Sequence, residues 1–404
     1  MLGIATLLVA SVHATEPVFI PELQFRPRFE ADSGRDRDPQ GGQVAFVTHR
    51  ARLGATMEWG PVSARLVFQD VRAWGEERDT RRDFSGDGID LAIGALTWAP
   101  HDRVRLILGR EEVGLHDERL VAKAGWRQPG RHFDGGRLTY DDGRWAAEIA
   151  GYIVLDGDRF QFTTQDQVEP DLRDQTLWWA RGGLQTDDTI AQLLVTLDDR
   201  RTARGGEVLR VTPGLFFKAD RGILQARLEA YGQLGRIASG GQTVRAGLVG
   251  TEIALRPDWT AGPSLILSYD ALSGDADPTD DRFTAFDTLR GANHRYYGTL
   301  DYAVFFRGGP ATAEGLHDPH LALGLKPHAR LSIELAQHLF APAVARDPAW
   351  TAWETDLNAR WSPLDVLALS GGGAVYLEPA SAVGREWFTY LMVDVNLRGP
   401  RIGG

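Results

Sequence analysis

The sequence contains no cysteine, only three methionines and only three lysines. Without cysteine the chain can form no disulfide bond and no thiolate site, which suits a protein that is exported. Beyond the first residues there is no run of about 18 consecutive apolar residues, so a transmembrane helix is excluded. No shift of composition and no linker rich in proline or serine divides the 404 residues. We therefore expect one large domain.

Arginine supplies nearly all of the positive charge. Of the 44 basic residues, only Lys123, Lys218 and Lys326 are lysines. Arginine stays charged at any working pH and presents a planar fork of donors that matches a carboxylate. Because the net charge is −11, this excess indicates many arginine–carboxylate pairs rather than a basic patch for nucleic acid. A GC-rich genome is the alternative source of the arginine-to-lysine ratio.

The first 14 residues, MLGIATLLVASVHA, form a short apolar stretch. Val12 and Ala14 fit cleavage by signal peptidase before Thr15. This predicts a signal peptide over residues 1–14 and a single mature domain over residues 15–404. No lysine or arginine precedes Arg26, so the charged start of a signal peptide is missing, which points to a misplaced start codon. A buried first helix or strand is the alternative.

Apolar and polar residues alternate with a period of two along most of the chain. In residues 224–233, for example, Gln225, Arg227 and Glu229 alternate with leucine and alanine. The alternating segments run for about 10 to 14 residues, the length that a tilted membrane-spanning strand needs and about twice that of a soluble strand. Tryptophans fall near the ends of these segments, as expected for side chains at a membrane–water interface.

Short and long connections also alternate. Turns such as 59–61, 100–102 and 141–143 are interleaved with long polar stretches such as 112–130, 273–293 and 306–318. This asymmetry is typical of outer-membrane barrels, and a closed barrel satisfies every backbone polar group in lipid. We therefore predict an all-β fold, a transmembrane antiparallel up-and-down barrel of about 18 strands. A water-soluble propeller is the alternative, but no repeat of about 40–50 residues supports it.

The stretch 108–138 gathers more charged residues, glycines and aromatic residues than any other connection. It contains L-G-R at 108–110, D-x-R-L at 117–120, W at 126 and G-R-x-F-D-G at 130–135, and N-H-R-Y-Y-G follows at 293–298. With these motifs the sequence resembles the alginate export family of outer-membrane proteins. The residues that carry the resemblance are Arg110, Asp117, Arg119, Trp126, Arg131, Phe133, Asp134, His294, Tyr297 and Gly298.

The resemblance implies a monomeric barrel of about 18 strands in the bacterial outer membrane. It implies contact with outer-membrane lipid and lipopolysaccharide, and insertion by the barrel-assembly machinery. It also implies an arginine-rich lumen that passes a polyanionic uronate chain out of the cell. One feature departs from the family's pattern, because the sequence ends on Gly403 and Gly404 rather than on an aromatic residue. Insertion is therefore expected to rely on the strand predicted over residues 387–397.

Charged residues share the polar face of the predicted strands and the adjoining turns, and we expect them to line the lumen. The expected substrate path comprises Arg50, Arg52, Arg65, Arg103, Arg105, Arg131, Arg137, Arg144, Arg227, Arg330 and Arg360. The expected lumen carboxylates are Glu58, Glu111, Glu148, Glu229, Glu334, Glu354 and Asp356. Unpaired arginines would recognise carboxylates by bidentate hydrogen bonds, and weak binding at many sites lets a polymer move. The alternative is that the arginines pair with neighbouring carboxylates and only stiffen the wall.

We therefore predict an outer-membrane channel that passes anionic polysaccharide or related anionic solutes. A general diffusion porin for small solutes is the alternative, and under both hypotheses the loop 112–130 is expected to narrow the pore. An outer-membrane enzyme is a remote alternative. Its candidate pairs, His116 with Asp117 and His317 with Asp318, lie in predicted loops, and no nucleophile has an activating partner.

No metal site and no cofactor is predicted. The histidines lack the spacing of zinc ligands. Four acidic residues, Asp275, Asp277, Asp280 and Asp281, share one loop and could hold calcium through their oxygens, but they lack the spacing of an EF-hand. We interpret them as a solvated acidic loop.

Overall fold

The computed structural model describes residues 16–33, 42–75, 89–155, 172–202, 207–237, 241–303, 313–344, 351–379 and 384–403. The segment predicted as a signal peptide, 1–14, lies outside these residues. In the part of the chain that is described, no helix is both long and apolar enough to cross a membrane. The strands are β1 (Val18–Asp32), β2 (Val44–Trp59), β3 (Val62–Ala73), β4 (Asp90–His101), β5 (Val104–Glu111), β6 (Phe133–Asp141), β7 (Trp145–Leu155), β8 (Leu172–Gln185), β9 (Thr189–Thr202), β10 (Glu207–Arg221), β11 (Leu224–Ile237), β12 (Gln242–Leu255), β13 (Ser264–Leu272), β14 (Arg282–Phe283), β15 (Leu316–His328), β16 (Leu331–Phe340), β17 (Ala352–Leu364), β18 (Leu367–Glu378) and β19 (Gly384–Arg398).

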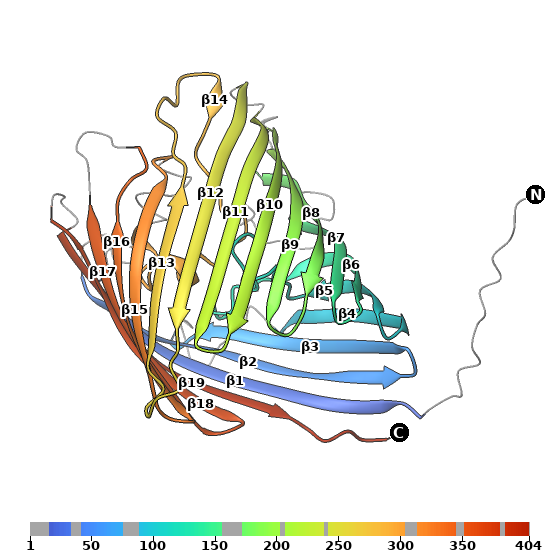
Figure 1. Ribbon diagram of the computed structural model, residues 1–404. Helices are drawn as coiled ribbons and strands as arrows, with labels where there is room; N and C mark the ends of the chain where they lie inside the picture. The colour runs from blue at the N-terminus through green and yellow to red at the C-terminus, as the bar shows by residue number, and fades with distance from the viewer. Residues whose placement is uncertain are drawn as a thin grey trace, which may run out of the picture.

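Eighteen of these strands form a closed antiparallel barrel (Figure 1). Each wall strand pairs with its neighbours in sequence, β13 pairs with β15, and β19 pairs with β1 to close the ring. The two-residue strand β14 pairs in parallel with the first residues of β12, Thr243 and Val244, and adds no strand to the wall. The predicted up-and-down barrel of about 18 strands is thereby confirmed.

The alternation of residue types decides which side chains face outwards. On β2 and β3, Leu53 and Leu66 are 65% and 51% exposed, whereas Val67, one position along, is 2% exposed and faces the interior. An outer face with so many apolar side chains is stable only in apolar surroundings such as membrane lipid. Strands of transmembrane barrels have such an apolar face towards the lipid. Exposed tryptophans occur close to both ends of the strands, at Trp59, Trp98, Trp145 and Trp361 beside short turns and at Trp74 and Trp353 beside long loops.

We call the end of the barrel with the short turns the short-turn rim, and the opposite end the long-loop rim. Both described ends of the chain lie at the short-turn rim, because Val18 is paired with Glu58 at the end of β2, and Arg398 is paired with Glu22. The residues after β19 stay attached to β1, since Ile402 exchanges two backbone hydrogen bonds of 2.9 Å with Phe19.

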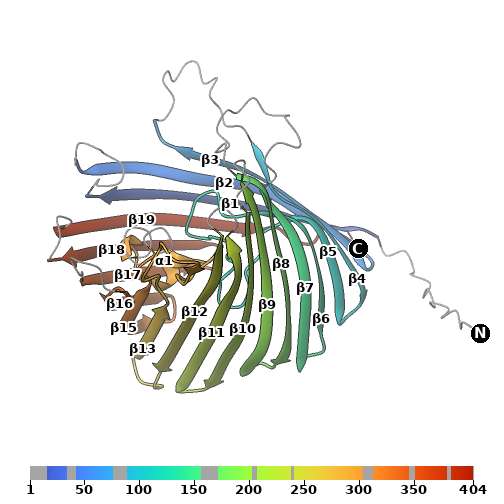
Figure 2. The same cartoon turned by 90° about the horizontal axis from the view of Figure 1, so that it is seen from above.

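Among the described residues, two connections from the long-loop rim turn into the barrel. The first, residues 112–132 between β5 and β6, is here called the inner loop. The second connection, between β13 and β15, is described over residues 273–303 and 313–315. These residues carry β14 and the one-turn helix α1 (Asn293–Tyr296) and are here called the second loop. Figure 2 shows α1 inside the ring of strands. We expected two separate loops, 273–293 and 306–318. That expectation is wrong, because α1 (293–296) lies inside the barrel and residues 316–318 belong to β15; residues 306–312 lie outside the described residues.

The hydrophobic core lies between these two loops and the wall. One connected cluster of buried side chains includes residues from the inner loop, from the second loop and from the wall. The inner loop contributes Val113, Leu115, Leu120 and Val121; the second loop contributes Phe286, Tyr296, Tyr297 and Tyr302; and the wall contributes Tyr152, Trp179, Tyr231, Phe340 and Tyr376. Both loops are therefore packed parts of the fold.

Candidate functional site

Arg119 fixes the inner loop to one side of the barrel wall. Its guanidinium donates two hydrogen bonds to Asp270 on β13, at 2.8 and 2.9 Å, and a longer one of 3.4 Å to Glu229 on β11. The hydroxyl of Tyr297 accepts a further bond at 3.0 Å, and the ring of Tyr296 lies 3.5 Å from the guanidinium carbon. Arg119, Asp270 and Glu229 are all buried, so their charges are compensated by one another.

β1 holds the other end of the inner loop. The guanidinium of Arg26 donates to the backbone carbonyls of Gly125 and Arg127, at 2.8 and 2.9 Å. That of Arg28 donates to the carbonyl of Trp126 at 2.6 Å and lies 4.2 Å from the centre of its ring. Sequence analysis missed both arginines, although the alternation of β1 places them on the polar face.

Residues 116 and 117 of the inner loop contact the side of the barrel opposite β1. His116 bonds to Gln192 of β9 at 2.9 Å, and Asp117 accepts a hydrogen bond of 3.0 Å from Lys218 of β10. In strand order, β9 and β10 lie half a turn of the ring away from β1. The inner loop therefore crosses the lumen.

Glu112 forms an ion pair at the entrance of the inner loop. Its carboxylate accepts a hydrogen bond of 2.7 Å from Arg52 of β2 and lies 3.4 Å from the Nε2 of His132. Burial raises the pKa of Glu112, but the hydrogen bonds from His132 and Arg52 outweigh burial and lower it to about 2. The carboxylate is therefore charged at neutral pH.

The two inward loops are joined to each other by backbone hydrogen bonds. Val121 and Arg290 form a parallel β-bridge, in which the amide of Ala122 donates to the carbonyl of Arg290 at 3.0 Å. The guanidinium of Arg131 donates to the same carbonyl. Residues 169 positions apart in the chain thus form one unit inside the lumen.

The two motif blocks that suggested the family meet in this unit. Trp126 of the first block stacks on His294 of the second, with ring centres 4.5 Å apart. Gly298 has a φ of +83°, and a Cβ at this position would lie 2.5 Å from the carboxylate of Glu354. Only glycine suits that combination of backbone conformation and close approach. Arg110 and Asp134 lie elsewhere, on the wall, where they pair across β5 and β6 at 2.8 and 2.9 Å.

The predicted lumen arginines fall into three groups by their partners. Those that pair with carboxylates are Arg52 with Glu112, Arg65 with Glu22, Arg137 with Glu111 and Glu148, Arg227 with Glu229 and Glu252, and Arg330 with Asp365. Those that donate to neutral oxygens are Arg50 to the Gln128 carbonyl, Arg131 to the Arg290 carbonyl and Arg360 to the Ser370 hydroxyl. Arg103, Arg105 and Arg144 are exposed and form no ion pair with another described residue.

The predicted lumen carboxylates are also distributed among several partners. Glu111 accepts a hydrogen bond of 2.5 Å from Tyr152, and Glu148 accepts one of 2.6 Å from Trp179. Glu354 accepts the amide of Leu300 in the second loop. Glu58 instead pairs at 2.6 Å with Arg401 of the C-terminal tail, at the short-turn rim.

A cavity of about 680 Å³ lies near the short-turn rim, beside the turn between β12 and β13. Its lining includes Arg256, Glu334, Asn358, Arg360 and Tyr390. This mixture of cationic, anionic and neutral polar groups can bind a hydrated solute.

The two candidate catalytic pairs are not formed. His116 stacks on Phe216 at 4.2 Å, and burial lowers its pKa to about 4, while Asp117 pairs with Lys218. His317 faces outwards against the hydroxyl of Tyr269 at 2.8 Å, whereas the neighbouring Asp318 faces the interior. Adjacent residues of a strand point to opposite faces, so this second pair cannot meet.

The acidic loop has a local structural role. A carboxylate oxygen of Asp275, of Asp277 and of Asp280 each accepts the backbone amide two residues further along. These are the hydrogen bonds of Asx turns. Among the described residues, only Asp318, His320 and His338 form a group of three ligands compact enough to hold a metal ion. No spacing in the sequence indicates this group, because its members lie on two strands.

A closed antiparallel barrel with an apolar outer face and a polar interior crossed by loops defines an outer-membrane channel of the porin type. The model of the family described as "Alginate export" matches residues 21–360. The chain therefore belongs to the alginate export family, and its location is the bacterial outer membrane. The short-turn rim then faces the periplasm and the long-loop rim the outside.

Solved structures of outer-membrane proteins share the fold. OccK3 (OpdO) of Pseudomonas aeruginosa is 16% identical, with 94% of this chain and 96% of that chain covered and a TM-score of 0.61. OccAB4 of Acinetobacter baumannii is 12% identical, with 96% and 99% covered and a TM-score of 0.63. At these identities the likeness concerns the fold alone. A search of curated proteins found no match.

Proposed function

We propose that this outer-membrane channel passes anionic solutes, with anionic polysaccharide as the main class, past arginines of its lumen. The proposal rests mainly on Arg105 and Arg360, whose guanidinium groups have no carboxylate partner among the described residues. Both lie on strand positions that face the lumen near the periplasmic rim, and neither forms an ion pair with another described residue. A guanidinium without a carboxylate partner retains its capacity for a bidentate bond to a solute carboxylate.

The arrangement also supports movement of a chain through the channel rather than tight retention. Arg65, which lies at a similar depth, is already bound to Glu22 by two hydrogen bonds of 2.8 Å. The periplasmic half of the lumen thus contains both arginines that are neutralised by a carboxylate and arginines that are not. A polyanion would meet a few weak sites in succession, and weak binding at several sites permits conduction.

Family membership supports the same substrate class without deciding it. We propose further that the protein is a transporter rather than an enzyme, since neither candidate His–Asp pair is formed. The exposed apolar belt is proposed to contact outer-membrane lipid and lipopolysaccharide, with the barrel acting as a monomer that the barrel-assembly machinery inserts.

Reversal potentials in planar bilayers under a KCl gradient test the proposal. The wild-type channel should prefer chloride, and Arg105→Gln/Arg360→Gln should move the reversal potential towards the potassium side. The matched control is Arg236→Gln/Arg245→Gln, which removes the same charge from residues on the outward face, where they share the face of the exposed Leu234. Cation selectivity of the wild-type channel would contradict the proposal.

Blockade by sugars identifies the cargo class. Short oligouronates added on the periplasmic side should interrupt the wild-type current, and neutral oligosaccharides of the same length should not. The double variant Arg105→Gln/Arg360→Gln should lose most of this blockade. Equal blockade by charged and neutral sugars would instead favour a general diffusion porin.

A further inference from the structure

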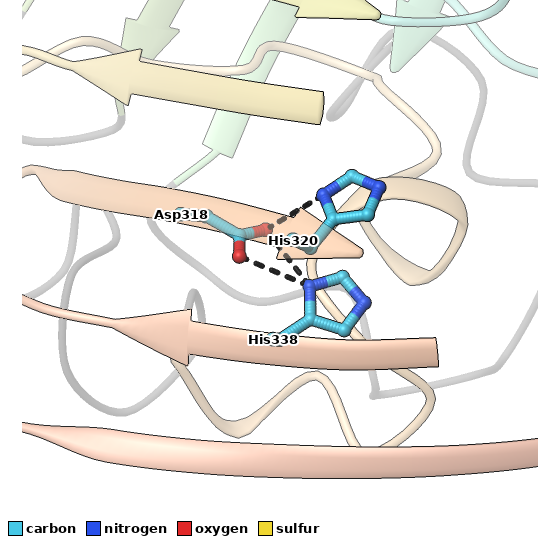
Figure 3. Close-up of side chains that lie close together, drawn as sticks. All are labelled: Asp318, His320 and His338. Atoms are coloured by element: carbon cyan, nitrogen blue, oxygen red, sulfur yellow. Dashed lines mark hydrogen bonds and ion pairs between the residues drawn. The ribbon is translucent and has the colours of Figure 1, made fainter. Parts of the chain in front are cut away.

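Asp318, His320 and His338 meet on the inner face of the wall (Figure 3). Asp318 and His320 are two positions apart on β15, so their side chains share one face. The register of β15 and β16 places His338 directly opposite His320. Figure 3 shows both imidazole rings turned towards the Asp318 carboxylate.

Three side-chain atoms that could bind a metal ion lie close to one another. The Nδ1 of His338 lies 3.0 Å from each carboxylate oxygen of Asp318, and the Nδ1 of His320 lies 3.8 Å from one of them. All the ligand atoms of the group lie within 4.8 Å of one another. A cation held about 2.0–2.2 Å from nitrogen and oxygen ligands needs these atoms roughly 3.3 Å apart, so small side-chain rotations suffice.

An ordinary ion pair accounts for only part of this arrangement. A hydrogen bond between His338 and Asp318 explains those two side chains, both of which are buried. It does not explain His320, whose Nδ1 is buried without a hydrogen-bond partner. At 3.8 Å that nitrogen is too far from Asp318 for a hydrogen bond. A buried polar atom left without a partner is costly, and a shared cation would satisfy it.

The surroundings fit a metal-binding histidine. The other ring nitrogen of His338, Nε2, lies 3.7 Å from a carboxylate oxygen of Asp356, whose second oxygen is buried without a partner. Histidines that bind metals usually direct their second nitrogen to a carboxylate, which orients the ring and raises its basicity. Asp270 is paired in register with Asp318, so the region holds more carboxylates than the single guanidinium of Arg119 neutralises.

The three ligand atoms indicate which kind of metal ion the site would bind. Two imidazole nitrogens and one carboxylate oxygen suit divalent transition metals such as Zn²⁺, whereas Mg²⁺ and Ca²⁺ prefer oxygen ligands. We propose that Asp318, His320 and His338 form a binding site for a divalent transition-metal ion of the zinc type in the channel wall. A tetrahedral ion there keeps one position for water or for a group of a passing solute. This site does not depend on the anion selectivity proposed above.

Titration of the purified, detergent-folded full-length protein with Zn²⁺ after treatment with EDTA tests the site. Isothermal titration calorimetry should find one tight zinc site per chain that Mg²⁺ does not fill. His320→Ala should weaken zinc binding by about a hundredfold, and Asp356→Asn by about tenfold. The matched control, His328→Ala, removes an exposed histidine of the β15–β16 turn and should leave the affinity unchanged.

Two further measurements distinguish loss of the metal site from loss of folding. His320 has no hydrogen bond to lose, so His320→Ala should fold, and unchanged migration of the unheated barrel in SDS gels checks this. Co²⁺ bound in place of Zn²⁺ should give the visible absorption of a tetrahedral site in the wild type and in His328→Ala only. Absence of zinc binding by the wild type, or equal affinity in His320→Ala, would overturn the proposal.

Discussion

Replacement of Arg119 by alanine is the sharpest test of how the inner loop is held. Among the described residues, the guanidinium of Arg119 is the only positive charge paired with Asp270, whereas Glu229 is also paired with Arg227. Glu229 keeps Arg227 at 3.0 Å after the replacement, but Asp270 loses both of its short hydrogen bonds. Arg119→Ala therefore leaves a buried carboxylate without its cation.

The expected cost follows from the burial of this pair. Breaking a buried ion pair by removing one partner destabilises a structure by about 3–5 kcal/mol. Because both loops and the wall stay covalently connected, the loss acts mainly on docking of the inner loop. With a tenfold change for about every 1.4 kcal/mol, the undocked population should rise by roughly a hundred- to a few thousandfold.

Single-channel recording in planar bilayers measures this population. The wild type should show a low conductance with rare large openings, and Arg119→Ala should show frequent large openings. Lys123→Gln, at an exposed position of the same loop, is the control and should behave as the wild type. Arg119→Ala/Asp270→Asn should recover part of the low conductance, because no buried charge is then left alone. A wild-type record from Arg119→Ala would refute the reasoning.

One further perturbation of the inner loop and one of the second loop have defined outcomes. The pKa of Glu112 lies near 2 instead of its ordinary 4.5, so its contribution to docking is complete above about pH 4.5 and is lost as the pH falls towards 2. Openings recorded from pH 7 to pH 3 should increase only below about pH 4.5, and Glu112→Gln should remove this dependence. Gly298→Ala should weaken docking by about 1–3 kcal/mol through its positive φ and the contact with Glu354, and should raise the frequency of openings. Gly125→Ala, where a Cβ meets no atom within 4 Å, should leave it unchanged.

The wall of the barrel was predictable because its determinants are local. Alternation with a period of two fixes which residues face the lumen, and the length of the segments separates membrane strands from soluble ones. For the same reason Arg65 and Glu148 were placed on the inner face, where the structure has them in contact with other polar residues.

The contents of the lumen were less predictable because they depend on contacts between distant segments. Alternation cannot show that Arg290 bonds to the inner loop, since no local pattern links residues so far apart. The helix α1 was hidden for a related reason, because a single turn of four residues has no hydrophobic periodicity of its own. Likewise, His320 and His338 meet only through the register of two strands, which the turn between them sets.

The contacts of Trp126 also bear on how the protein is assembled. Its ring touches Tyr390 of β19, with centres 4.8 Å apart, and Arg28 of β1, and these two strands form the joint that closes the cylinder. The paired positions across this joint are interrupted beside Pro27, which has no backbone N–H to donate. The inner loop therefore bridges the joint between the first and the last strand of the barrel. Tyr390 lies on the last strand of the barrel, so the inner loop can complete its contacts only after that strand is in place. Closure of the barrel and docking of the inner loop are therefore expected to occur together, late in assembly.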